Sequence, residues 1–278
     1  MKRFLLYVLL CVCPLAYADT LLTENFDYPV GTPLTSCGWT TPYDAVTSVT
    51  ITNGLKFNDY LCSDIGNAAL IDTKTGSAQP QLKFKSVPQT GDVYVAFLFQ
   101  PSIVAKKGYF LSLRDDKTTE YNFMGRVSIN EDYQLGLTFG DNQKAVYATE
   151  MLDGQRVYLV VLRYSILPET NDQVSLYAFS AMPAEQPEKP LIGPLSDTEK
   201  PDIEPANIVL RGFDNDTWLV IDGIRVATTW EEAVARTSAT DLPQTTSSNT
   251  TKAYKRMENG QLIVIRGDKK YNALGKEI

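Results

Sequence analysis

The sequence predicts an all-β fold, an antiparallel β-sandwich or jelly roll, followed by a short β tail. Between residues 19 and 236 the chain runs as short apolar segments separated by turn residues, with almost no helical period. Residues 92–100 and 157–164 are apolar on both faces, as strands in the middle of a sheet are. Residues 218–230 read as a long closing strand that runs directly into a helical turn. These three observations together indicate a two-layer sandwich.

The first strand is predicted at residues 21–26 and the second at 46–57, where Asn53-Gly54 marks a turn or a bulge. Residues 108–113 are expected to be the neighbour of the buried strand at 92–100. Six prolines between Met182 and Ala206 exclude this stretch from a sheet interior and predict a long surface connection. The other strands are expected at residues 68–72, 81–85, 126–129, 134–139, 145–149, 157–164, 174–180 and 208–213.

The closing strand is predicted to be apolar on two faces. Leu219, Ile221 and Ala227 are expected on one face, and the other is expected to carry Trp218, Val220, Ile224 and Val226, with Asp222 as the exception. We expect this strand to pair with the first mature segment, residues 20–28. We expect Asp222 to be satisfied by backbone amides or by Arg225 or Arg211 rather than to act in catalysis. Thr229-Trp230-Glu231-Glu232 is a capping box that predicts a short helix over residues 230–235.

Residues 1–18 have the features of a secretory signal peptide, with Lys2 and Arg3, an apolar run and an Ala16-Tyr17-Ala18 cleavage box. The apolar run is shorter than the ~20 residues that a membrane anchor needs, so no transmembrane segment is expected in the mature chain. The predicted sandwich domain is residues 19–236. Residues 237–252 read as a flexible polar linker, and residues 253–278 as a short tail with strands at 261–266 and 271–274.

The composition limits the chemistry and the partners. The 278 residues contain no histidine, which excludes Ser-His-Asp and Cys-His catalysis and any zinc site that needs imidazole. Without residues 1–18 the chain has 24 Lys and Arg against 33 Asp and Glu, a net charge of −9. Residues 252–278 alone carry seven positive and three negative charges, so the body is more acidic still. This charge argues against nucleic acid and anionic membranes as partners.

Two cysteines, Cys37 and Cys62, remain in the mature chain. In an exported protein an even number predicts a disulfide, which here closes a loop of about 25 residues and stabilises the fold by roughly 3–4 kcal/mol in the chain-entropy model. The alternative is a pair of buried thiols.

Several segments resemble a known family. L-T-E-N-F-D-Y-P-V-G-T-P-L, V-Y-V-A-F-L-F, M-G-R-V-S-I, Y-L-V-V-L-R-Y and W-L-V-I-D-G-I-R-V-A-T-T-W resemble laminin-G-like, concanavalin A-like jelly rolls of exported bacterial proteins. The resemblance covers about residues 19–236 and implies adjacent first and last strands. It also implies a fold that hosts lectins, glycan-binding modules, adhesion domains and glycoside hydrolases, among which fold alone does not choose.

The final part, M-E-N-G-Q-L-I-V-I-R-G-D-K-K-Y-N-A-L-G-K-E-I, resembles the carboxyl-terminal sorting region of type IX secretion cargo. The complete region has further strands, so the tail here resembles a truncated form. These resemblances imply a protein of the periplasm, the cell surface or the extracellular space of a Gram-negative bacterium.

Aromatic residues in loop-like sequence near the two cysteines form the candidate ligand site. Rigid exposed rings beside polar groups stack on sugar rings and bind their hydroxyls. The alternative is that these rings cover one open end of the sandwich. The candidate glycan site consists of Trp39, Tyr43, Tyr60, Asn58, Asp59 and Asp64.

The turn Asp214-Asn215-Asp216 is a candidate site for a structural Ca²⁺ ion, because oxygen-rich turns suit this ion. Turns of this composition also form for purely conformational reasons. The glycoside hydrolases of the family that the sequence resembles use the strand motif E-x-D-x-x-E, which the chain lacks. Its nearest approach, Glu199, Asp202 and Glu204, has the wrong spacing in a proline-rich loop.

The sequence therefore predicts an exported, non-catalytic binding module whose ligand is a polysaccharide or a glycoprotein glycan. One alternative is a glycoside hydrolase with an unrecognised carboxylate pair. Another is a protein-binding adhesin or a structural surface protein.

Overall fold

The computed structural model describes residues 19–41, 49–72, 79–117, 122–140, 143–199, 202–212, 216–237, 253–258, 261–266 and 269–271. The chain divides into two units, Met1–Thr237 and Ser238–Ile278. Each unit is described by itself below. The predicted signal peptide and the predicted linker lie outside the described residues.

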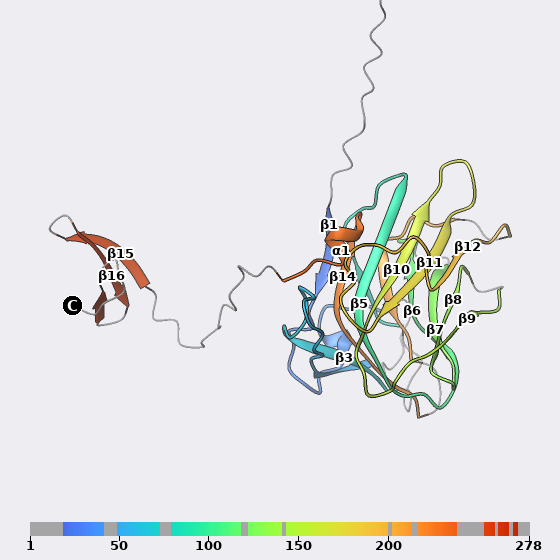
Figure 1. Ribbon diagram of the computed structural model, residues 1–278, viewed down its shortest axis with the longest axis horizontal. Coiled ribbons are helices and arrows are strands. Elements are labelled where there is room, and N and C mark those ends of the chain that lie inside the picture. Colours follow the sequence, from blue (N-terminus) through green and yellow to red (C-terminus); the bar gives the residue numbers. More distant parts are fainter. Residues whose placement is uncertain are drawn as a thin grey trace, which may run out of the picture. The chain divides into compact units, whose positions relative to one another are not determined.

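The first unit is a sandwich of two antiparallel sheets, as predicted (Figure 1). The eight-stranded sheet has the order β12 (Ile192–Leu195), β11 (Gln173–Phe179), β10 (Tyr158–Ile166), β5 (Gly91–Ile103), β14 (Trp218–Ala227), β3 (Asn67–Asp72) and β2 (Val49–Asn53), with β1 (Thr20–Glu24) also paired to β14. The six-stranded sheet has the order β4 (Gln81–Lys83), β13 (Asn207–Leu210), β6 (Gly108–Arg114), β7 (Phe123–Ile129), β8 (Gln134–Thr138) and β9 (Val146–Met151).

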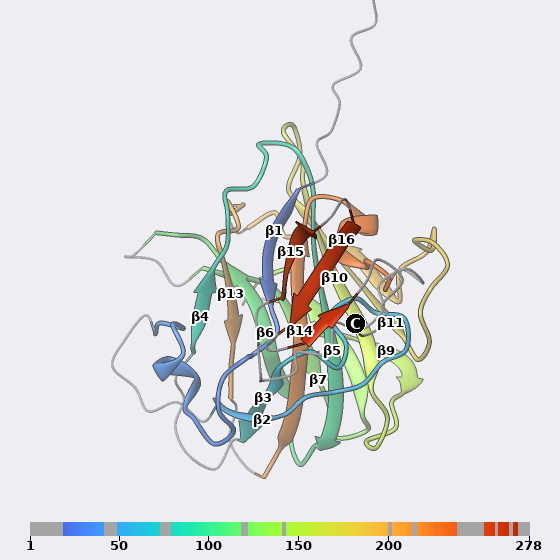
Figure 2. The ribbon, with the colours of Figure 1, turned by 90° about the vertical axis from the view of Figure 1, so that its left-hand side faces the viewer.

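The closing strand pairs with the first strand, which confirms the central prediction. β1 runs antiparallel to β14, with Thr20 opposite Ala227 and Glu24 opposite Ile224. On its other edge β14 pairs with β5, and both strands run through the middle of the larger sheet (Figure 2). One predicted pairing is wrong, because β6 lies in the smaller sheet between β7 and β13 and not beside β5.

The predicted faces of the closing strand are also wrong in their second half. Leu219, Ile221, Ile224 and Val226 all face the core between the sheets, so the alternation changes phase between positions 221 and 224. The pairing with β5 is irregular at this point, between Asp222 and Arg225. Gly223 has φ +54°, a conformation that glycine adopts readily. An irregularity of this kind inserts a residue and exchanges the two faces downstream of it.

Two hydrophobic cores lie on opposite faces of the larger sheet. In β5, Val93, Val95, Phe97 and Phe99 face the core between the sheets, and Tyr94, Ala96 and Leu98 face a second, outer core. This arrangement accounts for the segment's apolar character on both sides. The outer core is covered by the segment around Leu55–Cys62 and by the helix α1 (Trp230–Ala233).

The remaining elements differ in detail from the predictions. Thr229 caps α1, its side chain accepting a hydrogen bond from the Glu232 N–H at 3.3 Å, although the helix is shorter than expected. The proline-rich stretch contains a strand, β12, which is compatible with its prolines because it lies at a sheet edge. A single 3-10 turn, η1, spans Leu34–Ser36.

The second unit is a three-stranded antiparallel sheet of β15 (Ala253–Glu258), β16 (Gln261–Arg266) and β17 (Lys269–Tyr271). The sequence predicted a hairpin, so β15 is additional. Among the described residues no helix is long and apolar enough to cross a membrane.

Candidate functional site

Trp39 cannot serve as a sugar platform, because its ring is buried. Only 1% of its surface is exposed. The ring stacks on Phe26 with centroids 6.0 Å apart, and Nε1 donates a hydrogen bond to Glu24 Oε2 at 3.4 Å. The expected exposure of this residue is wrong, and its contacts correspond to the alternative in which the ring fills the core.

Tyr60 is equally inaccessible. It is 0% exposed, and its hydroxyl donates to the carbonyl oxygen of Gly223 at 2.9 Å. The ring therefore fastens its loop to the irregular part of β14. Tyr43, the third predicted ring, lies outside the described residues. The two described rings thus offer no stacking surface.

The predicted polar neighbours are exposed, but they surround no exposed ring. Asn58 and Asp59 line a hollow of about 450 Å³ together with Arg156 and Met182. Asp64 instead forms an exposed ion pair with the Lys56 Nζ at 3.0 Å. We assign no ligand to this hollow.

The predicted disulfide is not formed. Cys37 and Cys62 are both free, Cys62 being buried and Cys37 half-buried. Cys37 packs against the core between the sheets, and its thiol donates to the Pro33 carbonyl at 3.6 Å. Cys62 belongs to the outer core. Because the larger sheet separates the two cores, the sulfur atoms cannot meet without a rearrangement of the chain.

The predicted calcium turn is only partly described. Asp214 and Asn215 lie outside the described residues, and Asp216 has a left-handed φ of +47°. In the part of the chain that the structure describes, no group of three or more His, Cys, Asp or Glu side chains converges as metal ligands. The Ca²⁺ site stays a prediction.

Asp222 is buried on β14 and satisfied by backbone amides, as the sequence predicted. Its Oδ2 accepts the Leu55 N–H at 2.7 Å and its Oδ1 accepts the Gly223 N–H at 2.6 Å. Its pKa is raised to about 7, chiefly by burial and to a smaller extent by the Glu24 carboxylate, while the hydrogen bonds from the two amides oppose the shift. These contacts hold the loop at residue 55 against β14, so we assign Asp222 a structural role.

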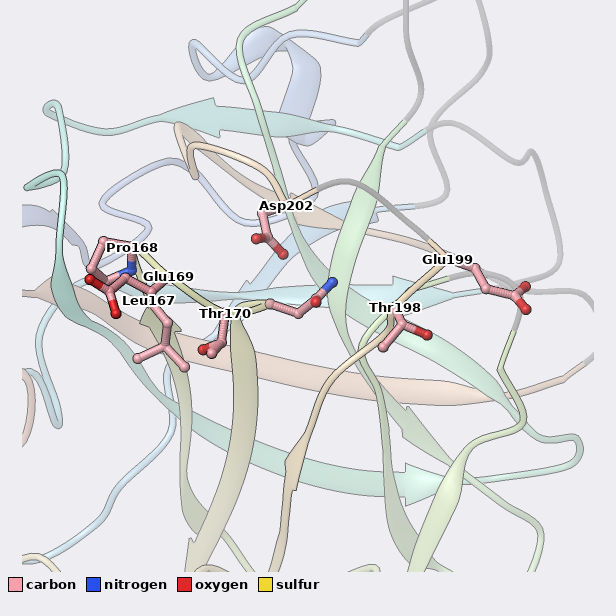
Figure 3. Close-up of a pocket in the computed structure, with 8 residues that line it drawn as sticks. Leu167, Pro168, Glu169, Thr170, Thr198, Glu199 and Asp202 are labelled. Atoms are coloured by element: carbon pink, nitrogen blue, oxygen red, sulfur yellow. The ribbon is translucent and has the colours of Figure 1, made fainter.

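A second hollow, of about 460 Å³, has an acidic lining (Figure 3). Its carboxylates do not converge, since Glu169 and Glu199 lie at opposite ends with Asp202 between them. Asp202 Oδ1 accepts the Asp172 N–H at 3.0 Å, and Asp197 Oδ1 accepts the Glu199 N–H at 2.9 Å. Asp197 and Asp202 therefore hold loop backbone, and the separated carboxylates of this hollow do not form the close pair that glycoside hydrolysis needs.

The outer face of the six-stranded sheet collects a different set of side chains. Leu113, Val127, Leu137 and Ile208 point from this sheet into the core between the sheets, so the alternate residues point outward. Within the strands the outward set contains no carboxylate, but Asp116, just beyond β6, pairs with Lys83, and the Glu131 carboxylate acts on Tyr147. The outward set consists of Gln81, Lys83, Tyr109, Ser112, Arg114, Phe123, Arg126, Ser128, Gln134, Gly136, Thr138, Tyr147, Thr149, Met151, Asn207, Val209 and, just beyond β13, Arg211.

Tyr109 is the centre of this outer face. The guanidinium carbon of Arg126 lies 4.7 Å from its ring centroid, and that of Arg211 lies 4.4 Å from it. Its hydroxyl also accepts a hydrogen bond from Gln79 Nε2 at 3.3 Å. Cation–π contacts at these distances hold the flat guanidinium groups in place on rigid strands.

Tyr147 lies across the neighbouring strand. Gly136 is opposite Tyr147 in the β8–β9 pairing, and a Cβ atom at position 136 would meet the ring at 2.7 Å. The ring therefore occupies the space that any larger residue would fill. Burial raises the pKa of Tyr147, and the Glu131 carboxylate adds to this effect.

Only part of the outer face is accessible, since Arg114, Asn207 and Val209 are buried. Tyr109, Arg126, Tyr147 and Arg211 are half-buried, whereas short outward residues such as Ser112 are inaccessible. The Ser112 Oγ has no hydrogen-bond partner in the described part of the chain. Half-buried tyrosines and guanidinium groups can stack on a flat ligand and donate hydrogen bonds to it.

Sequence reasoning missed this face. Its signal was the alternation in β7 and β8, where polar Arg126, Ser128 and Thr138 are interleaved with apolar residues. The sequence pattern instead indicated aromatic residues in loops, and of these Trp39 and Tyr60 are core residues.

Comparisons with known proteins give a fold-level likeness only. No family model and no curated protein matches the chain. Among solved structures, the globular domain of a T. cruzi calreticulin is 11% identical, with 78% of this chain and 91% of that chain covered and a TM-score of 0.46.

An endo-β-1,4-glucuronan lyase from the fungus Trichoderma reesei is 9% identical, covers 77% and 98%, and has a TM-score of 0.48. A carbohydrate esterase from a Shiga toxin-encoding bacteriophage, phi24B, is 13% identical, covers 76% and 99%, and has a TM-score of 0.47. Similarity at this level carries no argument about activity or ligand.

Proposed function

We propose that the protein is an exported, non-catalytic carbohydrate-binding module whose ligand lies on the outer face of the six-stranded sheet. The observation that carries this proposal is one row of the strand register, in which Tyr147 lies across Gly136 and the row continues through Ser128 to Tyr109 with its two arginines. Rigid rings of this kind stack on sugar rings, and polar groups beside them bind hydroxyls. Strands hold such groups more precisely than loops do.

The two alternatives have less support. A glycoside hydrolase needs two carboxylates roughly 5–9 Å apart, and the outward set has none among the described residues. A protein-binding adhesin favours a continuous apolar surface. The outer face is mostly polar and carries one large exposed apolar side chain among the described residues, Met151 of β9, and this is no continuous apolar surface.

A glycan array probed with residues 19–278 tests the proposal. We expect the wild type to bind a subset of glycans without releasing reducing sugar. Tyr147→Ala should lose most of this binding, and Tyr147→Phe should keep it because the ring remains. Gly136→Ala should weaken binding because the added Cβ displaces the Tyr147 ring. This variant tests whether the position of the ring matters, whereas Tyr147→Ala tests whether the ring is needed at all. An array without bound glycans, or release of sugar from one, would overturn the proposal.

The proposal includes export and processing. Residues 1–18 are proposed to be removed, and residues 253–278 to act as a sorting-like tail in a Gram-negative bacterium. Amino-terminal sequencing of the protein from the culture medium or the cell envelope should begin at Asp19. The Ca²⁺ site at residues 214–216 is likewise a proposal, tested by melting with and without a chelator.

A further inference from the structure

We propose that the ligand of the outer face is an acidic polysaccharide whose carboxylate or sulfate groups are bound by the guanidinium of Arg211, which is stacked on Tyr109. This inference rests on the proposed function, because it assumes that the outer face binds glycans. It adds the chemical class of the ligand and names the residues that select it.

The two arginines reach Tyr109 from the strands on either side of β6. The Arg126 guanidinium, from β7, lies 4.7 Å from the ring centroid, and its Nε donates a hydrogen bond to the Phe123 carbonyl oxygen at 3.0 Å. The Arg211 guanidinium, from the end of β13, lies 4.4 Å from the centroid, and the Arg211 backbone N–H donates to the Phe110 carbonyl at 2.8 Å, which fixes its chain position beside β6. The N–H edge of a stacked guanidinium matches the two oxygens of a carboxylate or sulfate.

Arg211 has donors to spare. Its guanidinium makes no hydrogen bond and no ion pair with any residue that the structure describes, and its contact with Tyr109 is through the ring face. Arg114, in contrast, uses its Nη atoms on Gln81 Oε1 at 2.9 Å and on the Lys117 carbonyl at 2.8 Å. Arg211 is therefore the arginine of this face best placed to bind an external anion.

The charge distribution favours an anion here and disfavours one elsewhere. The chain without residues 1–18 carries a net charge of −9. Within the strands the outward set contains one lysine and three arginines and no acid. Asp116, just beyond β6, pairs with Lys83 at 2.5 Å, and the Glu131 carboxylate acts on Tyr147, so the unpaired positive charge lies toward Arg211. A local positive region on an acidic protein selects and orients an anionic ligand without attracting polyanions to the rest of the surface.

The neighbouring Tyr147 favours a polysaccharide over a small anion. The Tyr147 ring lies across β8 in the same register row as Tyr109, with Ser128 and Gly136 between the two tyrosines, so the face suits an extended polymer with flat sugar faces and charged substituents. Single-stranded nucleic acid shares these properties, but the acidic body opposes a polyphosphate of high charge density.

Binding of the mature chain, residues 19–278, to four polymers tests the inference. The polymers are polygalacturonate for carboxylate, dextran sulfate for sulfate, neutral dextran and oligothymidylate, each at ~0.15 M salt, where long-range attraction is largely screened. We expect an acidic polysaccharide to bind best. Arg211→Gln should weaken this binding roughly 10-fold to 100-fold, because it removes a charge-assisted hydrogen bond. Arg211→Lys should fall between, because the charge stays and the fork is lost.

Arg156→Gln is the matched control, because Arg156 is an exposed arginine in the hollow beside Asn58 and outside the outward set. Melting curves of all variants check folding. Acidic and neutral polymers bound equally, or an unchanged affinity in Arg211→Gln, would overturn the inference and leave the proposed function standing. Tighter binding of oligothymidylate would overturn it in favour of nucleic acid. A wild type that binds no glycan at all would overturn both.

Discussion

Asp222 shows how a single residue couples two distant parts of the fold. Its two oxygens accept hydrogen bonds from the backbone of Leu55 and Gly223, and its side chain is 0% exposed. An ionised carboxylate at such a position loses its hydration, so burial favours the protonated form and raises the pKa from 3.8 to about 7. The residue therefore makes stability depend on pH.

We expect Asp222→Asn to remove part of that dependence. Between about pH 4 and 7 the folded protein retains a proton that the unfolded chain has released, so the free energy of unfolding falls as pH rises through this window. At about 1.4 kcal/mol per pKa unit, the wild type should lose up to about 4 kcal/mol relative to the variant between pH 4 and 8. Denaturant melts across this range measure the difference.

Asp64→Asn is the control, because Asp64 is an exposed turn residue with a left-handed φ of +59° that asparagine tolerates. Its stability curve should run parallel to that of the wild type. If the free energy of unfolding of the wild type and of Asp222→Asn changes with pH in the same way, Asp222 does not make stability depend on pH.

The two thiols should react with a thiol reagent at different rates, and reductant should not change the stability of the protein. Burial raises the pKa of both, and Cys62 is almost inaccessible. In the protein that begins at Asp19, a thiol reagent should label Cys37 slowly in the native state and Cys62 only after unfolding. Dithiothreitol should leave the melting temperature unchanged. If the denatured protein contains no titratable thiols, the two cysteines form the predicted disulfide and the present assignment is wrong.

At the scale of elements, alternation in the sequence reports which residues are buried but not where a strand changes phase. The apolar character of β5 and β10 on both sides correctly predicted central strands, because nothing interrupts their alternation. In β14 one glycine with φ +54° exchanged the faces of Ile224 and Val226. The same reading placed β6 beside β5, since a pattern identifies strands and not their partners.

Trp230 is the element-scale anchor of the outer core. Its ring makes edge contacts with Tyr94, Tyr177 and Phe179 at centroid distances of 6.0, 5.3 and 6.0 Å. Trp230→Ala should destabilise the protein by about 3–5 kcal/mol, because it removes a large buried ring and leaves a cavity. Trp218→Ala, at the opposite end of β14 and 36% exposed, should cost much less. Equal losses in urea melts would contradict the assignment of α1 as a cover for this core.

At the scale of the whole molecule, the sequence predicted the class of fold and the pairing of the first and last strands of the sandwich, but not the outer face on which binding is proposed. The first and last strands could be matched because the closing strand is long and apolar on both faces, and because the family resemblance implied that these two strands are adjacent. The candidate rings failed because Trp39 and Tyr60 are apolar enough to enter a core, and loop-like sequence does not reveal burial. The outer face combines residues from β6, β7, β8, β9 and β13, a set that only the pairing of distant strands assembles.

The first unit ends at Thr237, and two truncated chains, one ending there and one ending before α1, can test which residues stabilise the sandwich. The Leu61 N–H donates to the Ala235 carbonyl at 2.9 Å, and the Thr237 N–H donates to the Asp59 carbonyl at 3.0 Å. Residues after α1 therefore fasten the segment around Tyr60 over the outer core. The unit boundary between Thr237 and Ser238 places the second unit beyond these bonds.

A chain that ends at Thr237 should melt at the temperature of the longer protein and keep its affinity for glycans, because every strand pair of the sandwich is retained. A chain that ends at Thr228 keeps all fourteen sandwich strands but loses α1 and the bonds to residues 59 and 61. We expect it to lose several kcal/mol or to aggregate, because the apolar outer core becomes exposed. Calorimetry of both chains decides the matter. If the chain that ends at Thr237 also unfolds below the melting temperature of the longer protein, the sandwich depends on residues 238–278, and the two units are not independent.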